Sequence, residues 1–546
     1  MNTADFHTHP DRYVHWKLEV DGPVARMVMD VQEDRPWRPG YVLKLNSYDL
    51  GVDIELADAL QRIRFEHPEV KVLVFTSGND RVFSSGANIF MLQSSTHAFK
   101  VNFCKYTNET RLGLEELSCA SGIRSVAALN GTASGGGYEL AISCDEIHLI
   151  EDGNSAVSLP EVPLLGVLPG TGGLTRLVDK RKIRRDLADV FSTLAEGQRG
   201  PRAVKWNLVD ASWPKSKFEE KVGARVAEIA EGGTARGEAG TGIVFGPLDP
   251  KDEGNTRTYE HVTLELDEET RVATVTVNAP TTPQPTNPDE LRAAGDAAWV
   301  IRAWRELDDA LLQLRIMNVE IGVVVLQTRG DADAVAAADR LLVDHADDWL
   351  VKEVRLHLAR VLRRLDNTSK SLFAVLDEGS CFAGSLFEIA IAADRSFMLN
   401  EPDVPVHLRI GPLSGGALPM SHGLTRLQCR FLADPSMAAR ALETTEPIDA
   451  ETADELGLVT YAPDEIDWED EVRIAIEERA SLSPDALTGM EQNLRFAGPE
   501  TLETKVFGRL SAWQNWIFTR PNATGESGAL SVYGMPTRAS FDWKRT

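Results

Sequence analysis

The segment SVAALNGTASGGGYELAISCDE, residues 125–146, places a short apolar run before a glycine-rich turn and an apolar helix-forming stretch. Three consecutive glycines, Gly135–Gly137, open that stretch, and glycine lets another group approach the backbone closely. Free N–H groups at a helix N-terminus point outward and favour negative charge. The segment therefore predicts a site for an anion or a developing oxyanion. An ordinary strand-to-helix turn is the alternative. No GxGxxG pattern or P-loop lysine is present, which disfavours a nucleotide phosphate.

A second loop of the same kind lies upstream. VFSSGANIFML, residues 82–92, follows the apolar strand-like run VLVFTS, residues 72–77, and again combines small residues, a glycine and a helix-forming stretch. Two such loops after neighbouring parallel strands can direct two backbone donors at one carbonyl oxygen, as an oxyanion hole requires. Taken alone, this segment favours a simple connecting loop.

A third segment contains a glutamate among apolar residues. In SLPEVPLLGVLPGTGGLTRL, residues 158–177, Glu161 follows Pro160. An apolar setting disfavours the ionised carboxylate and raises its pKa, which suits a general acid or base near neutral pH. A salt-bridged structural glutamate is the alternative. The run PGTGG, residues 169–173, lacks the lysine of a phosphate loop, so a turn is predicted there.

The chain repeats the same order of elements twice. Apolar alternation and helical spacing recur in pairs of segments, which are 13–30 and 259–277, 55–64 and 306–315, 72–75 and 323–326, 125–146 and 371–395, and 173–177 and 423–427. Strands that alternate with helices predict a parallel sheet. We therefore expect an α/β protein formed by duplication.

The repeat and the composition predict four regions. Residues 1–230 form a first, catalytic domain, and 231–260, rich in glycine and charge, form a linker. Residues 261–480 form a second, degenerate domain. Residues 481–546 form a mostly helical tail with an irregular end.

The bulk composition excludes several classes of protein. With 57 Lys+Arg against 83 Asp+Glu, the net charge of −26 disfavours nucleic acid and anionic membranes as partners. Five scattered cysteines without a CxxC pair argue against disulfides and zinc, and His7 and His9 lack a third ligand, so no metal is expected. A cytoplasmic location is expected because neither a signal pattern nor a long apolar run occurs.

Taken together, the three segments resemble the enoyl-CoA hydratase, or crotonase, superfamily, whose early NAL-like motif is similar to LNS at 45–47. The resemblance implies two tandem crotonase-like β/α (spiral) domains plus the helical tail. It also implies that Ala87 and Gly136 donate the two oxyanion N–H groups. Glu139 and Glu161 become the acid and base.

The likeness extends further, to the ring-cleaving lyases of aerobic benzoyl-CoA breakdown, through segments such as THAFKVNFCKYTNETR and the C-terminal FDWKRT. It implies that 2,3-epoxy-2,3-dihydrobenzoyl-CoA and two waters become 3,4-didehydroadipyl-CoA semialdehyde and formate. No cofactor is implied beyond the coenzyme A of the substrate, and a homodimer is expected. The alternatives are a hydratase or isomerase acting on another acyl-CoA, and a non-catalytic scaffold.

Four further residues are candidates. Cys104 lies just past the first oxyanion loop and could border the pocket, although a buried inert thiol is the more common case. Coenzyme A carries phosphates, so we expect basic residues near its entry. Lys44, just before the NAL-like motif, and Lys180 and Lys182 of the basic run 180–185 are weak candidates, since a solvated helix face also explains that run.

The second half departs from the site pattern. Its segment 333–342 lacks the glycine of the first oxyanion loop, and its glycine triplet is reduced to Ala383-Gly384-Ser385. Glu388 corresponds to Glu139 with one extra residue before it. Asp403 is expected to keep a carboxylate at the place of Glu161. We therefore expect the second half to have lost catalysis.

Overall fold

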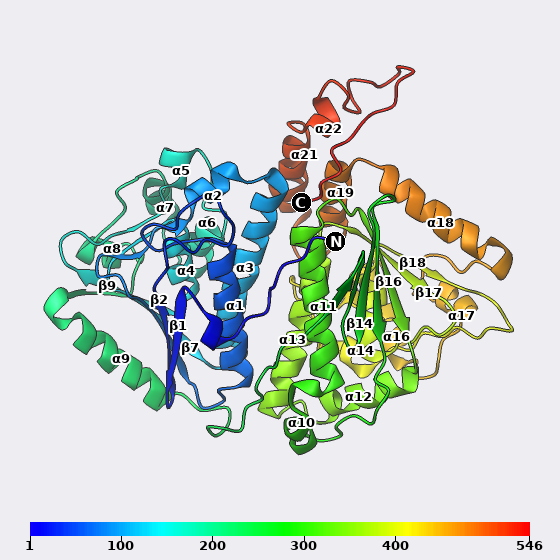
Figure 1. The fold of residues 1–546 in the computed structure, drawn as a ribbon, viewed down its shortest axis with the longest axis horizontal. Helices are drawn as coiled ribbons and strands as arrows, with labels where there is room; N and C mark the ends of the chain where they lie inside the picture. Colours follow the sequence, from blue (N-terminus) through cyan, green and yellow to red (C-terminus); the bar gives the residue numbers. More distant parts are fainter. The chain divides into compact units, whose positions relative to one another are not determined.

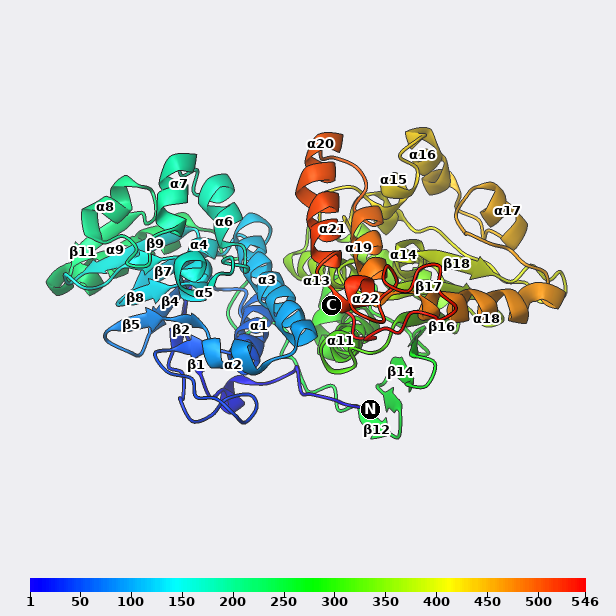
Figure 2. The same cartoon turned by 90° about the horizontal axis from the view of Figure 1, so that it is seen from above.

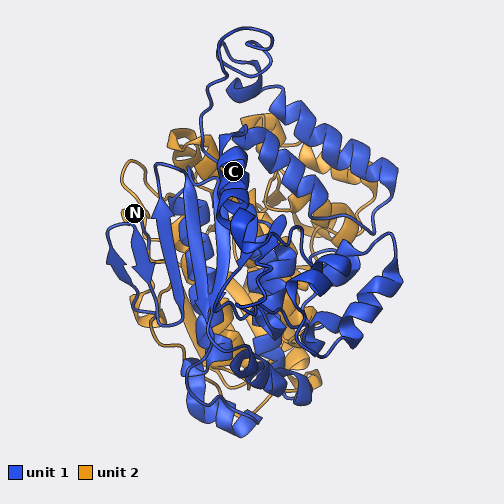
Figure 3. Cartoon of the chain, turned by 90° about the vertical axis from the view of Figure 1, so that its right-hand side faces the viewer, with its two compact units in different colours: residues 1–4, 248–546 blue, residues 5–247 orange.

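The computed structural model describes residues 1–546 and divides into two compact units (Figure 3). The N-terminal unit comprises Asp5–Pro247, and the C-terminal unit comprises Leu248–Thr546 together with Met1–Ala4. The first four residues join the second unit because Ala4 N–H donates to Gln313 Oε1 (3.0 Å) and Gln313 Nε2 donates to the Ala4 carbonyl (2.7 Å).

The N-terminal unit contains a six-stranded sheet in the order β1-β2-β4-β7-β9-β11. The predicted hairpin at 13–30 is the antiparallel pair β1–β2, and the other neighbours are parallel. The strands are β1 (Trp16–Asp21), β2 (Val24–Met29), β4 (Val72–Ser77), β7 (Arg124–Leu129), β9 (Glu146–Glu151) and β11 (Ala211–Pro214).

A second, smaller sheet follows from the first. After each of β4, β7 and β9 the chain forms a short strand, and these three strands pair in parallel in the order β10-β8-β5. A separate two-stranded pair, β3–β6, lies outside both sheets. The short strands are β3 (Ser47–Tyr48), β5 (Val82–Ser84), β6 (Gly86–Ala87), β8 (Thr132–Ser134) and β10 (Val157–Ser158). The loop that contains Gly86 and the turn at Gly135–Gly137 therefore each follow a strand of this smaller sheet.

Helices cover the large sheet of this unit (Figure 1). The apolar side of α9 packs on Val72, Val126 and Ile150 of the sheet. Elsewhere in the unit α1 contacts α3, and α3 contacts α4. Asp49 caps α1 by accepting from the N–H groups of its first turn. The helices are α1 (Leu50–Phe65), α2 (Ile89–Ser94), α3 (His97–Cys119), α4 (Gly136–Ser143), α5 (Glu161–Leu165), α6 (Gly173–Thr175), α7 (Arg185–Ser192), α8 (Gly200–Lys205) and α9 (Phe218–Gly232).

The C-terminal unit contains a seven-stranded sheet in the order β12-β13-β14-β15-β16-β17-β18. Its first three pairs are antiparallel hairpins and the rest are parallel. Two of its strands lie within 231–260, so part of the expected linker belongs to the sheet. The strands are β12 (Lys251–Glu253), β13 (Thr256–Thr258), β14 (Val262–Asp267), β15 (Val272–Asn278), β16 (Val323–Arg329), β17 (Ser371–Leu376) and β18 (Arg395–Met398).

The order of the elements repeats that of the N-terminal unit. A hairpin is followed by a long helix, a strand, helices, a second strand, a short buried helix and a third strand. Helix α18 packs on Val323, Phe373 and Phe397 of its sheet as α9 does on the other. The predicted α/β fold is confirmed. The helices up to α18 are α10 (Pro288–Ala294), α11 (Trp299–Leu312), α12 (Ala332–Asp344), α13 (Trp349–Asp366), α14 (Gly384–Ala392), α15 (Arg426–Arg430), α16 (Pro435–Glu443), α17 (Ala450–Glu455) and α18 (Glu465–Ser481).

The C-terminal tail is helical and belongs to the C-terminal unit (Figure 2). Its helices are α19 (Pro484–Leu494), α20 (Leu502–Lys505), α21 (Ser511–Ile517) and α22 (Pro521–Thr524), and α19 contacts α21. Arg545, close to the C-terminus, is buried and pairs with Glu491 of α19 at 2.6 Å. The irregular end is thus anchored to the helices.

Candidate active site

The glycine turn before α4 has a conformation that few other residues adopt. Gly135 has a φ of +53°, and its N–H donates to the Ser158 carbonyl at 2.9 Å. Gly136 is the first residue of α4, so its N–H has no carbonyl in its own helix to bind. A Cβ atom on Gly136 would lie 2.1 Å from Tyr48 Oη. The turn therefore requires glycine and leaves one backbone donor available.

The second predicted donor lies beside the first. Ala87 pairs with Tyr48 across β6 and β3, and the next N–H, that of Asn88, donates to the Tyr48 carbonyl at 2.8 Å. Successive N–H groups of an extended segment point to opposite sides, so Ala87 N–H points away from β3. A Cβ on Gly86 would lie 2.6 Å from Gly136 N. The two loops are therefore in contact, and the structure brings the two predicted donors together.

Glu139 is buried in α4 and fully engaged in hydrogen bonds. Its Oε1 accepts from the N–H groups of Thr171 (2.9 Å) and Gly173 (2.8 Å), and its Oε2 accepts from the Thr171 hydroxyl. On balance the pKa of Glu139 is raised, because burial, the largest cause, outweighs the hydrogen bonds from Thr171 and Gly173 that lower it. These donors stabilise the ionised carboxylate.

Glu161, the first residue of α5, has a contrasting environment. It is 9% exposed, its Oε2 has no hydrogen-bond partner, and a Cβ on Gly135 would lie 2.8 Å from its Oε1. Burial, and then the charge of Glu139, raise the pKa of Glu161 to about 7. The two carboxyl groups therefore differ in their donors: three hydrogen bonds favour the ionised form of Glu139, whereas Glu161 has no donor at Oε2, which favours its protonated form.

Cys104 lies on α3 near both the site and a second buried acid. Burial first, and then the charges of Glu139 and Asp53, raise the pKa of the Cys104 thiol to about 11. The side chain is partly exposed. A thiol with this pKa stays protonated at neutral pH, so it can donate a hydrogen bond but is a poor thiolate nucleophile.

The three candidate lysines differ in their surroundings. Lys44 and Lys182 are exposed. Lys180 is held in place, because its Nζ donates to Glu115 Oε1 (2.9 Å) and to the Ser143 carbonyl (2.7 Å). Of the two lysines in the basic run, Lys182 is therefore the exposed one, while the Lys180 ammonium is bound within the protein.

Two features of this site were not predicted from the sequence. The run PGTGG at 169–173, which was predicted to be a simple turn, supplies the Thr171 and Gly173 donors that hold Glu139. Tyr48 was also missed. The NAL-like motif fits better when its asparagine is aligned with Asn46, so that it covers Asn46-Ser47-Tyr48 and not 45–47. In that alignment Tyr48 takes the position of the motif's leucine.

Residues 42–256 match the enoyl-CoA hydratase/isomerase family. The whole chain is similar to the benzoyl-CoA-dihydrodiol lyase of Aromatoleum evansii, with 52% identity over 99% of this chain and 98% of that protein. The chain belongs to the crotonase superfamily. It is an enzyme of that superfamily, and the fold and family predicted from the three segments are confirmed.

Two further proteins are similar to only part of the chain. The fatty acid oxidation complex subunit alpha of Shewanella loihica is 33% identical over 36% of this chain and 26% of its own length. A solved enoyl-CoA hydratase structure from Geobacillus kaustophilus has 29% identity over 40% of this chain and 75% of that chain, with a TM-score of 0.35.

The C-terminal unit has a turn that corresponds to the glycine turn before α4. In this turn, however, the backbone N–H that corresponds to the donor of Gly136 is already hydrogen-bonded. Gly384 has a φ of +52° and donates to the Arg409 carbonyl at 3.0 Å, as Gly135 does to Ser158. The following N–H, that of Ser385, donates to Asp339 Oδ2 at 2.5 Å. Asp339 comes from α12, which replaces the first oxyanion loop, and burial raises its pKa to about 7.

This correspondence corrects two details predicted from the sequence. Because Gly384 matches Gly135, Glu388 stands four residues on, just as Glu139 does, with no extra residue. Glu388 lies 3.2 Å from Arg426, which neutralises it. Asp403 does not take the place of Glu161, since it lies exposed in a turn. The carbonyls of Ser158 and Arg409 correspond, because each accepts from the glycine of its turn. Glu161 stands three residues after Ser158, and the residue three positions after Arg409 is Pro412.

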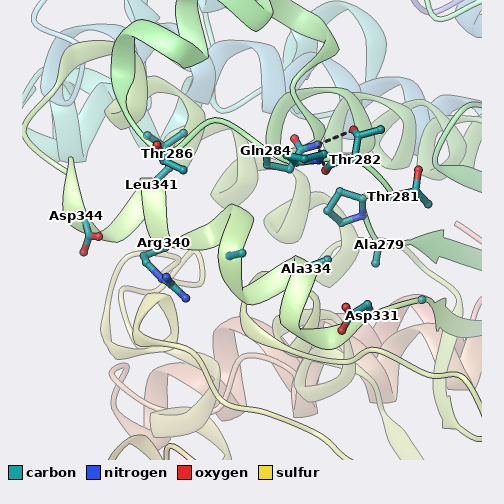
Figure 4. Close-up of a pocket in the computed structure, with 14 residues that line it drawn as sticks. Ala279, Thr281, Thr282, Gln284, Thr286, Asp331, Ala334, Arg340, Leu341 and Asp344 are labelled. Carbon is teal, nitrogen blue, oxygen red and sulfur yellow. Dashed lines mark hydrogen bonds between the residues drawn. The ribbon is translucent and has the colours of Figure 1, made fainter.

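A pocket of the C-terminal unit lies apart from these acids (Figure 4). It has a volume of about 670 Å³ and lies between α12 and the segment that follows β15. Arg340 is its one cation, and Asp331 and Asp344 are its two acidic residues. It has neither a glutamate pair nor the Gly384 turn, so it offers no acid and base for crotonase chemistry.

Two further findings concern metals and membranes. No group of three or more His, Cys, Asp or Glu side chains is placed so that it could hold a metal ion. None of the helices combines the length and the apolar character needed to cross a membrane.

Proposed function

We propose that this crotonase is a ring-cleaving lyase that converts 2,3-epoxy-2,3-dihydrobenzoyl-CoA and two waters to 3,4-didehydroadipyl-CoA semialdehyde and formate. The similarity to benzoyl-CoA-dihydrodiol lyase over 99% of the chain supports the benzoyl-CoA-derived substrate. The two glutamates beside two backbone donors support chemistry on a CoA thioester.

The oxyanion hole suits this reaction because breaking the ring bond places negative charge on the thioester oxygen. The carbon lost as formate is attached to the ring carbon α to the thioester. When that bond breaks, its electron pair is left on the α carbon and is delocalised as a thioester enolate. In the proposed mechanism the N–H groups of Ala87 and Gly136 donate to the enolate oxygen. Such donors are most effective when they are fixed before the charge develops.

The two glutamates have different proposed roles because their environments differ. Glu139, whose ionised form is favoured by the donors of Thr171 and Gly173, accepts a proton from the attacking water. Glu161, which has no donor at Oε2, holds a proton near neutral pH and transfers it to the epoxide oxygen as the ring opens. Cys104, as a neutral thiol, contacts the substrate and does not attack it.

Substrate turnover tests the proposal. Purified protein incubated with 2,3-epoxybenzoyl-CoA is expected to release one formate per CoA thioester consumed, measured with formate dehydrogenase and by mass spectrometry of the CoA product. Crotonyl-CoA serves as the comparison substrate. Hydration of crotonyl-CoA without formate release from the epoxide would favour the alternative, a hydratase on another acyl-CoA.

The activity is expected to depend on pH through the two glutamates. Glu161 acts in its protonated form, so kcat/KM should fall as the pH rises through about 7. At low pH, protonation of Glu139 should also lower the rate. The Thr171→Val variant removes one donor to the Glu139 carboxylate, which should raise its pKa and move the acidic limb upward. Initial rates across the pH range test this, and a profile with no alkaline limb would contradict the role of Glu161.

The binding of coenzyme A and the assembly are also proposals. Lys44 and Lys182, which are exposed, remain the candidates for the phosphates, whereas the contacts of Lys180 favour a structural role. The C-terminal unit is proposed to be non-catalytic. A homodimer remains a prediction.

A further inference from the structure

Tyr48 has a buried hydroxyl group with no hydrogen-bond partner in the protein. The side chain is 1% exposed, and Oη makes no hydrogen bond. Buried tyrosine hydroxyls usually find a partner. Those of Tyr41 and Tyr138 do so, donating to Asp49 Oδ2 (2.8 Å) and to the Leu208 carbonyl (2.7 Å). The hydroxyl of Tyr48 is therefore an exception that calls for an explanation.

This hydroxyl lies at the oxyanion hole. Tyr48 Oη would be 2.1 Å from a Cβ atom on Gly136, so it fills the space where that side chain would be. In a helix both the Cα–Cβ bond and the N–H point toward the N-terminus. The hydroxyl is therefore on the side of α4 that the Gly136 N–H faces. The backbone of Tyr48 also pairs with Ala87, the other donor.

The ring of Tyr48 is held by its neighbours. The Phe103 ring centroid lies 6.0 Å from that of Tyr48, and the Arg111 guanidinium carbon lies 5.5 Å from the Tyr48 centroid. Arg111 is itself fixed by Asp53 at 3.5 Å, and all of these side chains are buried. The hydroxyl therefore has a fixed position before any substrate binds.

The hydroxyl is a neutral donor. Burial raises the pKa of Tyr48 far above its ordinary value, the charges of Asp53 and Glu139 raise it further, and only Arg111 opposes them. The phenol is thus neutral near physiological pH. It cannot act as a base, and its O–H bond is available to an oxygen that enters the site.

We propose that Tyr48 Oη donates a third hydrogen bond to the thioester oxygen as it becomes an enolate, alongside the N–H groups of Ala87 and Gly136. This inference rests on the proposed function, because it requires a thioester oxygen in that hole. It accounts for the tyrosine in the NAL-like motif, for the glycine at 136 and for the missing partner of Oη.

The Tyr48→Phe variant tests this role. The expected result is a fall in kcat of about 10²-fold with KM little changed, because the lost bond is strongest in the transition state. The melting temperature is expected to stay the same or rise, because the variant removes a buried hydroxyl that had no partner. A merely structural tyrosine would leave kcat unchanged.

A spectroscopic measurement separates this inference from the proposed function. Bound benzoyl-CoA labelled at its carbonyl should show a lowered C=O stretching frequency in the wild type, and part of that shift should be lost in Tyr48→Phe. The Tyr41→Phe variant is the control, since it removes a bond to Asp49 and should lower the melting temperature without changing the frequency.

The outcomes have distinct meanings. A shift in the wild type that Tyr48→Phe retains in full would overturn the role of Tyr48 while leaving the two backbone donors in place. The absence of any shift in the wild type would overturn the oxyanion hole itself and, with it, the role of Tyr48.

Discussion

Replacing Glu161 by glutamine is expected to lower kcat for ring cleavage by about 10²–10⁴-fold, the range that a general acid or base contributes. Glutamine has nearly the same shape as glutamate, so the turn of α5 and the Gly135 contact should be kept. What is lost is the proton that Glu161 holds near neutral pH. Release of formate from 2,3-epoxybenzoyl-CoA measures the effect.

The control for this variant comes from the second half of the chain. Asp403→Asn changes the acidic residue that sequence similarity pairs with Glu161, but which lies exposed in a turn. It should leave kcat, KM and the melting temperature unchanged. A Glu161→Gln enzyme with more than a tenth of the wild-type kcat would show that the proton comes from another group.

Replacing Gly86 by alanine is expected to cost at least 10²-fold in kcat, as expected for loss of one oxyanion donor. The new Cβ would lie 2.6 Å from Gly136 N and 2.9 Å from the Ser134 carbonyl, so the two loops must separate. The distance between the N–H groups of Ala87 and Gly136 then changes. Turnover under saturating substrate measures the loss.

A matched variant separates the collision from backbone strain. Gly153 has a φ of +83°, close to the +86° of Gly86, but a Cβ there would meet nothing within 4 Å. Gly153→Ala should therefore lose stability from its unfavourable φ and keep its kcat. If Gly86→Ala and Gly153→Ala lowered the melting temperature equally and neither changed kcat, the hole would not depend on the contact between the two loops.

Much of this architecture could be predicted from local patterns. The strand 72–77, the helix that contains 55–64 and the glycine turn at 135–137 are set by apolar periodicity and by glycine, which act over a few residues. The repeat then extended the prediction to the second half. The two glutamates stood out because their segments are otherwise apolar.

What the sequence did not reveal depends on contacts between distant segments. Thr171 and Gly173 meet Glu139 more than thirty positions away, and Tyr48 meets Gly136 across almost ninety. Asp339 meets Ser385 only because α12 replaces a loop. The alignment of Asp403 with Glu161 was wrong because insertions shift the carboxyl-bearing turn, and only the matched hydrogen bonds of Gly135 and Gly384 correct the register.

The carboxylate of Asp339 can be regarded as a tethered inhibitor. It occupies the donor N–H of the C-terminal unit through a bond within the chain, and a tethered group has an effective concentration that free ligands rarely reach. Any acyl-CoA would have to displace it before using that turn. In the C-terminal unit the glycine turn is therefore closed by the chain itself, whereas in the N-terminal unit the corresponding N–H of Gly136 is left available.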